Sequence, residues 1–288
     1  KLKIVPESVS YSDAEISDKL LKLDKTCCIV KNGDSIGVCL KEDADESTSG
    51  LSMSLLATAL PLKTTQLGDP EFIKFHGLKM AYMTGSMANG IASENLVISS
   101  GKFGLLSSFG AAGLLPSIIE QAINNIQKAL PEGPYAFNLI HSPSEDAIEK
   151  AAVDLYLKYH VRTVEASAFL GLTPNIVRYR VAGLRRNSQN QVEITNRVIA
   201  KISRAEVASK FMAPAPEAIL NKLVEEKSIT REQAQLATAV PMADDITVEA
   251  DSGGHTDNRP LVSLLPAIIA LREQFQKQYG YSHIIRVG

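Results

Sequence analysis

The feature of this chain that most limits its possible folds is a repeat of a short apolar run, a loop of small or polar residues, and a helical stretch. The repeat begins at Leu78 and continues to the end of the chain. Its apolar runs lie near Leu78–Met83, Phe103–Ser107, Tyr135–Leu139, Val161–Glu165, Glu193–Lys201, Ile246–Glu249 and His283–Val287. Strands that alternate with helices along a chain become neighbours in a parallel sheet. The repeat therefore predicts an α/β fold.

The loops decide between the two common parallel-sheet architectures. No GxGxxG follows the first predicted strand, so a dinucleotide-binding doubly wound sheet loses its main support. Small or polar residues follow one strand after another, which is typical of a (β/α)8 TIM barrel with one ligand shared at the carboxyl ends of its strands. Only seven strands can be assigned, and the last ends at Val287. We therefore expect a TIM barrel that is truncated after strand seven.

The chain divides into two predicted domains. Residues 1–77 predict a small amino-terminal α+β cap module, and residues 78–288 predict the barrel. Residues 214–242 interrupt the repeat and predict a helical insertion within the barrel domain. This organisation gives one large core and one small one.

Local signals predict several turns and helix ends. Asn32-Gly33 lies between two apolar runs and predicts a hairpin turn. Asp69-Pro70 predicts a helix start, and Gly77 predicts its end. Thr173-Pro174 predicts another helix start, and Thr230 has the capping-box spacing to Gln233.

Composition excludes several classes of function. A formal charge of −2 gives no electrostatic basis for binding nucleic acid or an anionic membrane. No apolar run reaches the roughly 18 residues that a membrane span requires. Cys27, Cys28 and Cys39 include no CxxC pair, so we expect a reduced, cytoplasmic setting in which these thiols pack as small core residues. We expect no metal site.

The most distinctive chemical motif follows the sixth predicted strand, where the chain reads Asp251-Ser252-Gly253-Gly254-His255. Two adjacent glycines at a strand end let the backbone approach a flat or anionic ligand, because no Cβ stands in the way. The glycines are followed directly by His255, and histidine is the residue type whose unperturbed pKa lies near neutrality, which suits proton transfer. The motif therefore predicts the edge of an active site. A plain Gly-Gly turn followed by a surface histidine explains the same five residues equally well.

The segments AYMTGSMANGIAS, FNLIHSP, VEASAFLGLTPNIVRYR, NRVIAKISR and ITVEADSGGHTDNRPL resemble the PfaD-type enoyl reductases of polyunsaturated fatty acid and trans-acyltransferase polyketide synthases. That family belongs to a wider group of flavin-dependent barrels that includes the nitronate monooxygenases. The resemblance implies a TIM barrel that holds FMN at its carboxyl face. It also implies that NADPH reduces the flavin, which then reduces a 2-enoyl thioester on an acyl carrier protein.

The resemblance also assigns roles to individual positions. The matching cofactor-binding positions are Met83, Thr84, Gly85, Asn138, Glu165, Lys201, Gly253 and Gly254. Met83 would supply an apolar, polarisable surface on which the flavin ring packs. Asn138 would supply an amide donor, and Lys201 would supply a positive charge near N1. The same three residues could instead be a core side chain, a turn former and an exposed lysine.

The catalytic assignment falls on His255. Hydride delivery to the β-carbon of an enoyl thioester leaves an enolate, and His255 would protonate its α-carbon or polarise the thioester carbonyl. His141, which closely follows the third predicted strand, is the rival candidate.

Two alternatives to enoyl reduction remain open. One is a nitronate monooxygenase-like flavin oxidase, and the other is a non-catalytic flavin-binding or scaffold subunit of a multienzyme complex. The expected partners are an acyl carrier protein, the synthase complex and a second copy of the chain in a homodimer, with no nucleic acid and no membrane.

Overall fold

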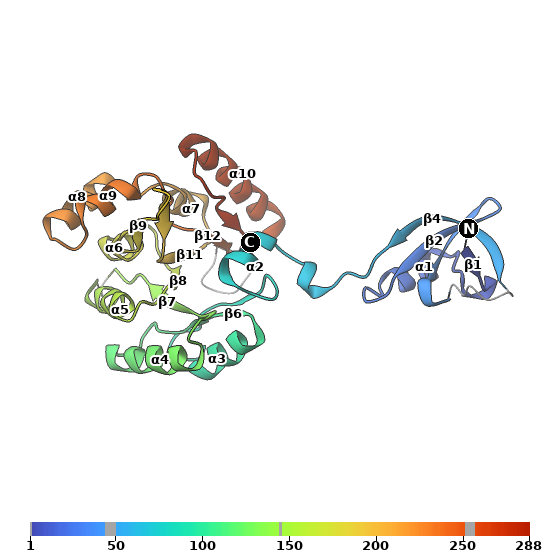
Figure 1. Ribbon diagram of the computed structural model, residues 1–288, viewed down its shortest axis with the longest axis horizontal. Helices are drawn as coiled ribbons and strands as arrows, with labels where there is room; N and C mark the ends of the chain where they lie inside the picture. The colour runs from blue at the N-terminus through green and yellow to red at the C-terminus, as the bar shows by residue number, and fades with distance from the viewer. Residues whose placement is uncertain (1, 44–49, 144–145, 251–256) are drawn as a thin grey trace. The chain divides into compact units, whose positions relative to one another are not determined.

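The structure is a computed structural model that describes residues 2–43, 50–143, 146–250 and 257–288. The chain forms two compact units, Lys1–Leu67 and Gly68–Gly288 (Figure 1). Sequence analysis placed the division later, after Gly77. The intervening helix α2 (Pro70–His76) belongs to the second unit, because the side chain of His76 hydrogen-bonds Asp245 and the guanidinium of Arg197 donates to the carbonyl of Phe75.

The described part of the first unit contains a four-stranded antiparallel sheet in the order β1-β4-β2-β3. Its strands are β1 (Leu2–Ile4), β2 (Cys27–Asn32), β3 (Ser35–Leu40) and β4 (Leu51–Ala59). Its helical elements are η1 (Pro6–Ser8), α1 (Asp13–Leu20), η2 (Lys41–Asp43) and η3 (Thr64–Gln66). The predicted hairpin is confirmed, because β2 and β3 pair from Asn32 and Ser35 outward and Gly33 has a φ of 60°.

The core of the first unit includes the cysteines. Cys28 and Cys39 pack with Ile4, Val30 and Met53, and Cys27 packs in a neighbouring cluster. All three are free thiols. Burial is the main cause that raises the pKa of the Cys39 thiol to about 11. The prediction that these thiols pack as core residues is therefore confirmed.

The described part of the second unit contains a sheet of seven strands, all parallel, in the order β13-β12-β11-β8-β7-β6-β5. The strands are β5 (Met83–Thr84), β6 (Leu106–Phe109), β7 (Ala136–Ile140), β8 (Thr163–Ser167), β11 (Arg197–Ile202), β12 (Asp245–Val248) and β13 (Arg286–Val287). Each strand pairs with the strand that comes before or after it in the predicted repeat. The predicted TIM-barrel-like α/β architecture is confirmed.

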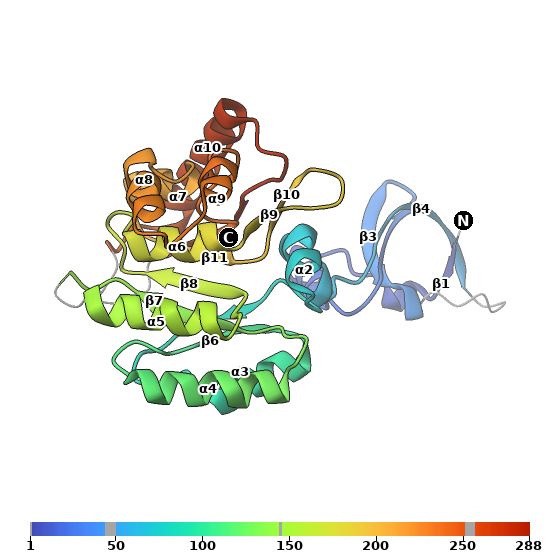
Figure 2. The ribbon, with the colours of Figure 1, turned by 60° about the vertical axis from the view of Figure 1, so that its left-hand side comes forward.

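Helices cover the outer side of this curled sheet (Figures 1 and 2). They are α3 (Glu94–Phe103), α4 (Pro116–Ala129), α5 (Asp146–Lys158), α6 (Pro174–Ala182), α7 (Ala205–Met212), α8 (Glu217–Glu225), α9 (Arg231–Ala237) and α10 (Leu261–Tyr279). The predicted helical insertion corresponds to α8 and α9. The cap signals are confirmed: Thr173 caps α6, Thr230 and Gln233 form a capping box on α9, and Gly77 ends α2 with a φ of 68°.

Strand alternation determines which side chains reach the interior of the curled sheet. Phe137, Val164 and Val198 belong to the large apolar cluster that the strands share with the surrounding helices. Their neighbours Ala136 and Ile199 belong to a separate cluster with Leu78 and Leu106, inside the curl. Successive side chains of a strand point to opposite faces. Asn138 and Lys201 each lie two residues after an interior residue, and Glu165 lies one residue after the outward-facing Val164. These three side chains therefore also point to the interior, toward the carboxyl ends of the strands.

No helix within residues 2–43, 50–143, 146–250 or 257–288 combines the length and apolarity needed to cross a bilayer.

Candidate functional site

A cavity of about 540 Å³ lies at the carboxyl ends of β7, β8, β11 and β12. Its polar lining residues are Ser86, Asn138, Ser167, Lys201, Ser203, Arg204, Glu249 and Asp257. Its apolar lining residues are Met87, Ala88, Ala112, Ile140, Ala168, Phe169, Leu170, Ile202 and Val207. This volume falls within the range of about 300–1,000 Å³ that is typical of small-molecule sites. A largely apolar wall with a few polar groups suits a flat organic ligand.

Two of the predicted site residues are direct neighbours in the sheet. Asn138 on β7 is the register partner of Glu165 on β8. The amide Nδ2 of Asn138 donates to the Glu165 carbonyl at 3.1 Å and to the Ser167 Oγ at 2.8 Å. Both side-chain hydrogens of the amide are therefore directed to protein acceptors, and its Oδ1 is left as the group that can accept from a ligand.

Glu165 contacts the loop that follows β5. Its Oε2 accepts a hydrogen bond from the backbone N–H of Ser86 at 2.9 Å. A Cβ on Gly85 would lie 3.4 Å from Oε1, so the loop backbone runs close beside this carboxylate. Glu165 is 2% exposed, and it does not line the cavity. The structure thus places Glu165 behind a cavity-lining residue, where it holds the loop.

Lys201 lies in the cavity wall and pairs with Glu249. Its Nζ is 2.9 Å from the Glu249 Oε1, and both residues line the cavity. The two side chains come from the adjacent strand ends of β11 and β12, whose alternation turns both inward. The pair places an ammonium group and a carboxylate side by side in the cavity wall, and sequence analysis identified the lysine but not its carboxylate partner.

The rim of the cavity carries a second ion pair that sequence analysis missed. The guanidinium of Arg204 donates from Nε at 2.8 Å and from Nη2 at 3.0 Å to the two carboxylate oxygens of Asp257, and the Ser203 Oγ donates at 3.2 Å. The Arg204 hydrogen bonds are the main cause that lowers the pKa of Asp257. These residues are 53 positions apart in the chain, so no local spacing signals the pair.

The remaining predicted flavin contacts lie elsewhere or outside the described residues. Met83 lines a separate cavity of about 390 Å³ together with Thr247 and Val287, and the Thr84 Oγ1 donates to the Ser107 Oγ at 2.5 Å. Gly253, Gly254 and His255 lie outside the described residues. Glu249 and Asp257, which lie on either side of that segment in the sequence, both line the main cavity.

His141 is held beside the same cavity by a buried carboxylate. Its Nδ1 lies 2.9 Å from the Oε2 of Glu149, which is 2% exposed, and its ring stacks on cavity-lining Phe169 with centroids 5.4 Å apart. The Glu149 contact fixes the ring orientation. His141 itself is absent from the cavity wall.

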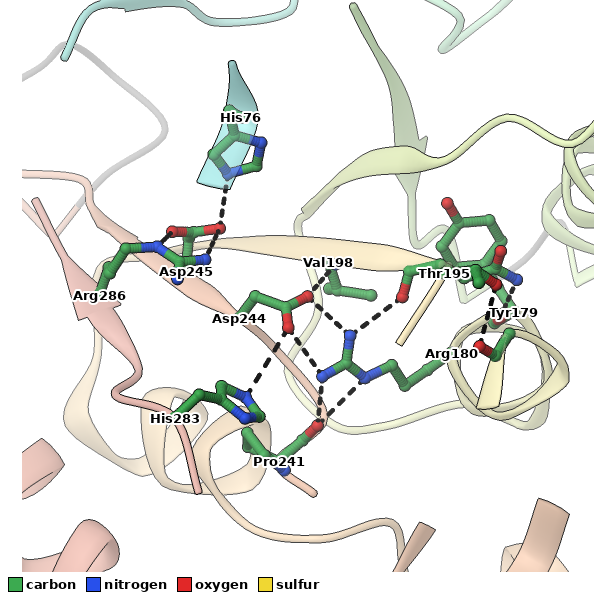
Figure 3. A network of polar contacts seen from close by, with 12 residues as sticks. His76, Tyr179, Arg180, Thr195, Val198, Pro241, Asp244, Asp245, His283 and Arg286 are labelled. Carbon is green, nitrogen blue, oxygen red and sulfur yellow. Dashed lines mark hydrogen bonds and ion pairs between the residues drawn. The ribbon is translucent and has the colours of Figure 1, made fainter. Parts of the chain in front are cut away.

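The acidic pair Asp244-Asp245, which precedes the sixth predicted strand, lies at the opposite end of the sheet (Figure 3). Asp244 is fully buried and receives hydrogen bonds from two guanidinium nitrogens of Arg180, at 2.6 and 3.0 Å, and from the backbone N–H of Val198 at 3.0 Å. Asp245 forms a two-point contact with Arg286 and a 2.9 Å contact with His76. These contacts join α6, β11, β12, β13 and α2, so both aspartates have structural roles.

Comparisons with known proteins agree with this architecture. The chain is 53% identical over 227 residues to a polyunsaturated fatty acid synthase protein of Thraustochytrium, an alignment that covers 79% of this chain and 15% of that protein. It is 47% identical over 223 residues to the polyketide biosynthesis protein PksE of Bacillus subtilis, covering 77% of this chain and 29% of that protein. The chain is a homologue of both proteins. The resemblance to the PfaD-type group is thereby confirmed.

A solved structure shares the fold. The enoyl reductase domain of MlnA, from the macrolactin biosynthesis cluster of Bacillus amyloliquefaciens, superposes with a TM-score of 0.75 and 37% identity. The match covers 78% of this chain and 51% of that one. No family model matches the chain. The chain spans less than a third of the length of the two curated relatives described above.

Proposed function

We propose that this chain is an enoyl reductase of polyunsaturated fatty acid or polyketide biosynthesis. It reduces the 2,3-double bond of an enoyl thioester that an acyl carrier protein delivers. The observation that carries the proposal is the cavity at the carboxyl ends of the strands, where Asn138 and Lys201 line one wall together. The homology to a polyunsaturated fatty acid synthase protein and to a polyketide biosynthesis protein supports it, as does the shared fold with the MlnA enoyl reductase domain.

The residues around the cavity fit the ring system of FMN. Phe169, Ile202 and Met87 provide apolar walls, and Lys201 brings an ammonium group. The Asn138 amide uses its nitrogen within the protein, and its oxygen accepts no side-chain or backbone hydrogen bond from the part of the chain that the structure describes. A flavin requires these three features: an apolar bed, polar partners for its ring edge, and a cation that stabilises its reduced anionic form. When bound, FMN would supply hydride transfer from NADPH to the substrate.

The resemblance-based contacts complete the proposed cofactor site. The backbone of the loop at Thr84 and Gly85 would run along the flavin, with Met83 at its start, and Gly253 and Gly254 would border it from the sixth strand of the repeat. Glu165 acts on this site indirectly. Its carboxylate holds Ser86, so the loop is ordered before a ligand arrives. Such ordering lowers the entropic cost of binding.

The chain must also deliver a proton. Hydride addition at the β-carbon of the thioester leaves an enolate, and protonation at the α-carbon completes the two-electron reduction. We assign that proton to His255, which the sequence places between the cavity-lining residues Glu249 and Asp257. A positioned general acid contributes typically about 10²–10⁴-fold to the rate.

The test is an assay of purified protein, beside a visible absorption spectrum that reports bound flavin. Oxidation of NADPH that depends on a crotonyl thioester is the expected result. Oxygen uptake with a nitroalkane, without thioester reduction, would establish a nitronate monooxygenase-like oxidase in its place. A flavin spectrum with neither activity would establish a non-catalytic role.

A further inference from the structure

A second cavity of about 540 Å³ lies at the amino ends of the strands, opposite the candidate active site. Three parts of the chain form its walls: the end of α2, the turn between α4 and β7, and the turn between α5 and β8. Arg197 at the start of β11 and Leu106 at the start of β6 complete the lining. No step of the proposed reaction uses this cavity.

The lining is strongly cationic. Lys74, Arg162 and Arg197 contribute three positive charges, and Glu132 contributes one negative charge, so the formal balance is +2 with the histidines neutral. Lys74 and Arg162 are exposed, and neither forms an ion pair with any residue that the structure describes. The net formal charge of the lining is therefore equal in size and opposite in sign to that of a dianion.

Arg197 is the most constrained of these cations. Its Nη1 donates to the Phe75 carbonyl at 2.6 Å, and its guanidinium carbon lies 4.2 Å from the centroid of the Phe75 ring. Within the described ranges its side chain has no direct carboxylate partner. Burial is the main cause that lowers the pKa of Arg197; the charges of Asp244 and Asp245 oppose this effect, and those of Arg286 and Arg162 add to it. An anion in the cavity would offset that desolvation.

We propose that this cavity binds a small phosphate monoester, with the phosphate dianion among Lys74, Arg162 and Arg197. Guanidinium groups recognise phosphate through paired hydrogen bonds, and several nitrogens of Arg197 remain available after its contact with Phe75. The volume exceeds that of a phosphate group alone, and the rings of Phe75, Tyr135 and Tyr159 line the remaining space. These rings suit an apolar or aromatic substituent on the ester.

Titration calorimetry with phenyl phosphate tests the proposal, with phenol as the ligand that lacks the dianion. We expect one saturable site for phenyl phosphate and none for phenol. Arg162→Gln and Lys74→Gln should each weaken binding by about 2- to 5-fold, and the double variant by about 4- to 25-fold, as for independent exposed ion pairs. Lys277→Gln, on α10, makes the same charge change outside the cavity and should leave the affinity unchanged.

Because Lys74 and Arg162 are exposed, these variants should keep the unfolding temperature of the parent protein. Equal affinity in the parent and the double variant, within twofold, would overturn the proposal. Loss of binding in Lys201→Gln with full binding in Arg162→Gln would also overturn it, because that result places the phosphate at the opposite end of the sheet. Neither outcome depends on reductase activity, so this test is separate from that of the proposed function.

Discussion

The carboxylate of Glu165 accepts a hydrogen bond from the backbone N–H of Ser86 at 2.9 Å, across 79 positions of sequence. This contact connects β8 to the loop after β5, and Ser86 lines the candidate active site while Glu165 does not. The loop therefore depends on a buried charged acceptor from a different strand. A change at Glu165 should affect the cavity without removing any cavity-lining atom.

Replacement of Glu165 by alanine should weaken both the fold and cofactor binding. The substitution leaves the Ser86 N–H without its acceptor, a loss of about 1–3 kcal/mol for a hydrogen bond to a charged group. Urea unfolding measures the stability, and the flavin absorption per protein measures the cofactor. Glu165→Gln keeps an acceptor oxygen and is the matched control. We expect this variant to retain most of the stability and most of the bound flavin. Equal flavin content in the alanine variant and the parent protein would show that the loop needs no such support.

Replacement of His255 by alanine should separate the two half-reactions. Reduction of the flavin by NADPH requires no proton transfer to carbon, so that rate should stay nearly unchanged. Reduction of the enoyl thioester should slow by about 10²–10⁴-fold. Stopped-flow absorbance on flavin-replete protein measures each step, and His141→Ala is the comparison. If thioester reduction is slowed by the His141 variant and not by the His255 variant, the proton donor is His141.

Replacement of Lys201 by glutamine should make the bound flavin harder to reduce. The variant removes the positive charge that the cavity wall offers to the reduced anion and leaves Glu249 nearby. We expect the midpoint potential to fall by about 30–60 mV, which corresponds to about 1.4–2.8 kcal/mol for a two-electron couple. Spectroelectrochemical titration measures the potential. Lys222→Gln on α8 is the control for a distant loss of charge, and an equal shift in both variants would argue against a local effect.

Removal of Arg180 should destabilise the fold more than removal of its whole ion pair. Arg180 is 1% exposed and Asp244 is fully buried, so Arg180→Leu leaves a buried carboxylate without its cation. We expect a loss of about 3–5 kcal/mol. The double variant Arg180→Leu with Asp244→Leu should recover part of that loss, because no uncompensated charge remains. Chemical denaturation of the two variants decides the point: a double variant that is less stable than Arg180→Leu would contradict it.

The free energy of unfolding should fall on acidification, and protonation of His283 should cause the first part of this fall. Burial is the main cause that lowers the pKa of His283, with the charges of Arg180 and Arg286 adding to it and that of Asp244 opposing it. The unfolded chain therefore binds this proton more tightly than the folded chain does. Its stabilising contribution is complete above the ordinary pKa of about 6.5 and declines as the pH falls below it.

His283→Gln should flatten the stability profile just below pH 6.5, and thermal unfolding at stepped pH values measures this change. His160→Gln, at an exposed position, is the matched control. A second decline at lower pH should persist in both variants. Burial acts to raise the pKa of Asp244, but the charge and hydrogen bonds of Arg180 outweigh it and the net effect is a lowered pKa. An unchanged profile in His283→Gln would remove His283 from the acid response.

Local chemistry explains which elements could be predicted from the sequence. Gly77 follows α2 in a left-handed conformation, and Thr230 with Gln233 caps α9, because both signals act over a few residues. The strand β4 was not predicted. It pairs with both β1 and β2, so its place depends on partners far away in the sequence. Leu51, Met53 and Leu55 alternate with Ser52 and Ser54 as in a strand, but the apolar run Leu55-Leu56-Ala57 interrupts the pattern.

Strand limits were predicted less well than strand order. The run from Leu78 was expected to form a strand to Met83, but β5 covers only Met83–Thr84. Leu78 is buried against Leu106 at the amino end of the sheet, so its apolarity reflects tertiary packing. The fifth run likewise contains two elements: Glu193 belongs to the hairpin of β9 (Leu184–Arg186) and β10 (Val192–Ile194), and β11 begins at Arg197.

The candidate site shows the same division between local and distant signals. Asn138 and Lys201 could be identified because each lies near the end of a strand. Glu249, the partner of Lys201, and the Arg204–Asp257 pair could not, because each pairing depends on which strands become neighbours. Sequence periodicity specifies the face of a strand, and only the sheet order specifies which side chains meet across it.

The helix α2 is the first element after the division between the two units, and it is tied to the amino ends of two strands. Arg197 on β11 contacts Phe75, and Asp245 on β12 contacts His76. The same two strands carry Lys201 and Glu249, about 13 Å further along at the usual rise of about 3.3 Å per residue. A force applied to α2 would thus act along the two strands whose other ends carry Lys201 and Glu249, so the position of this short helix and the geometry of the cavity wall are connected through the sheet.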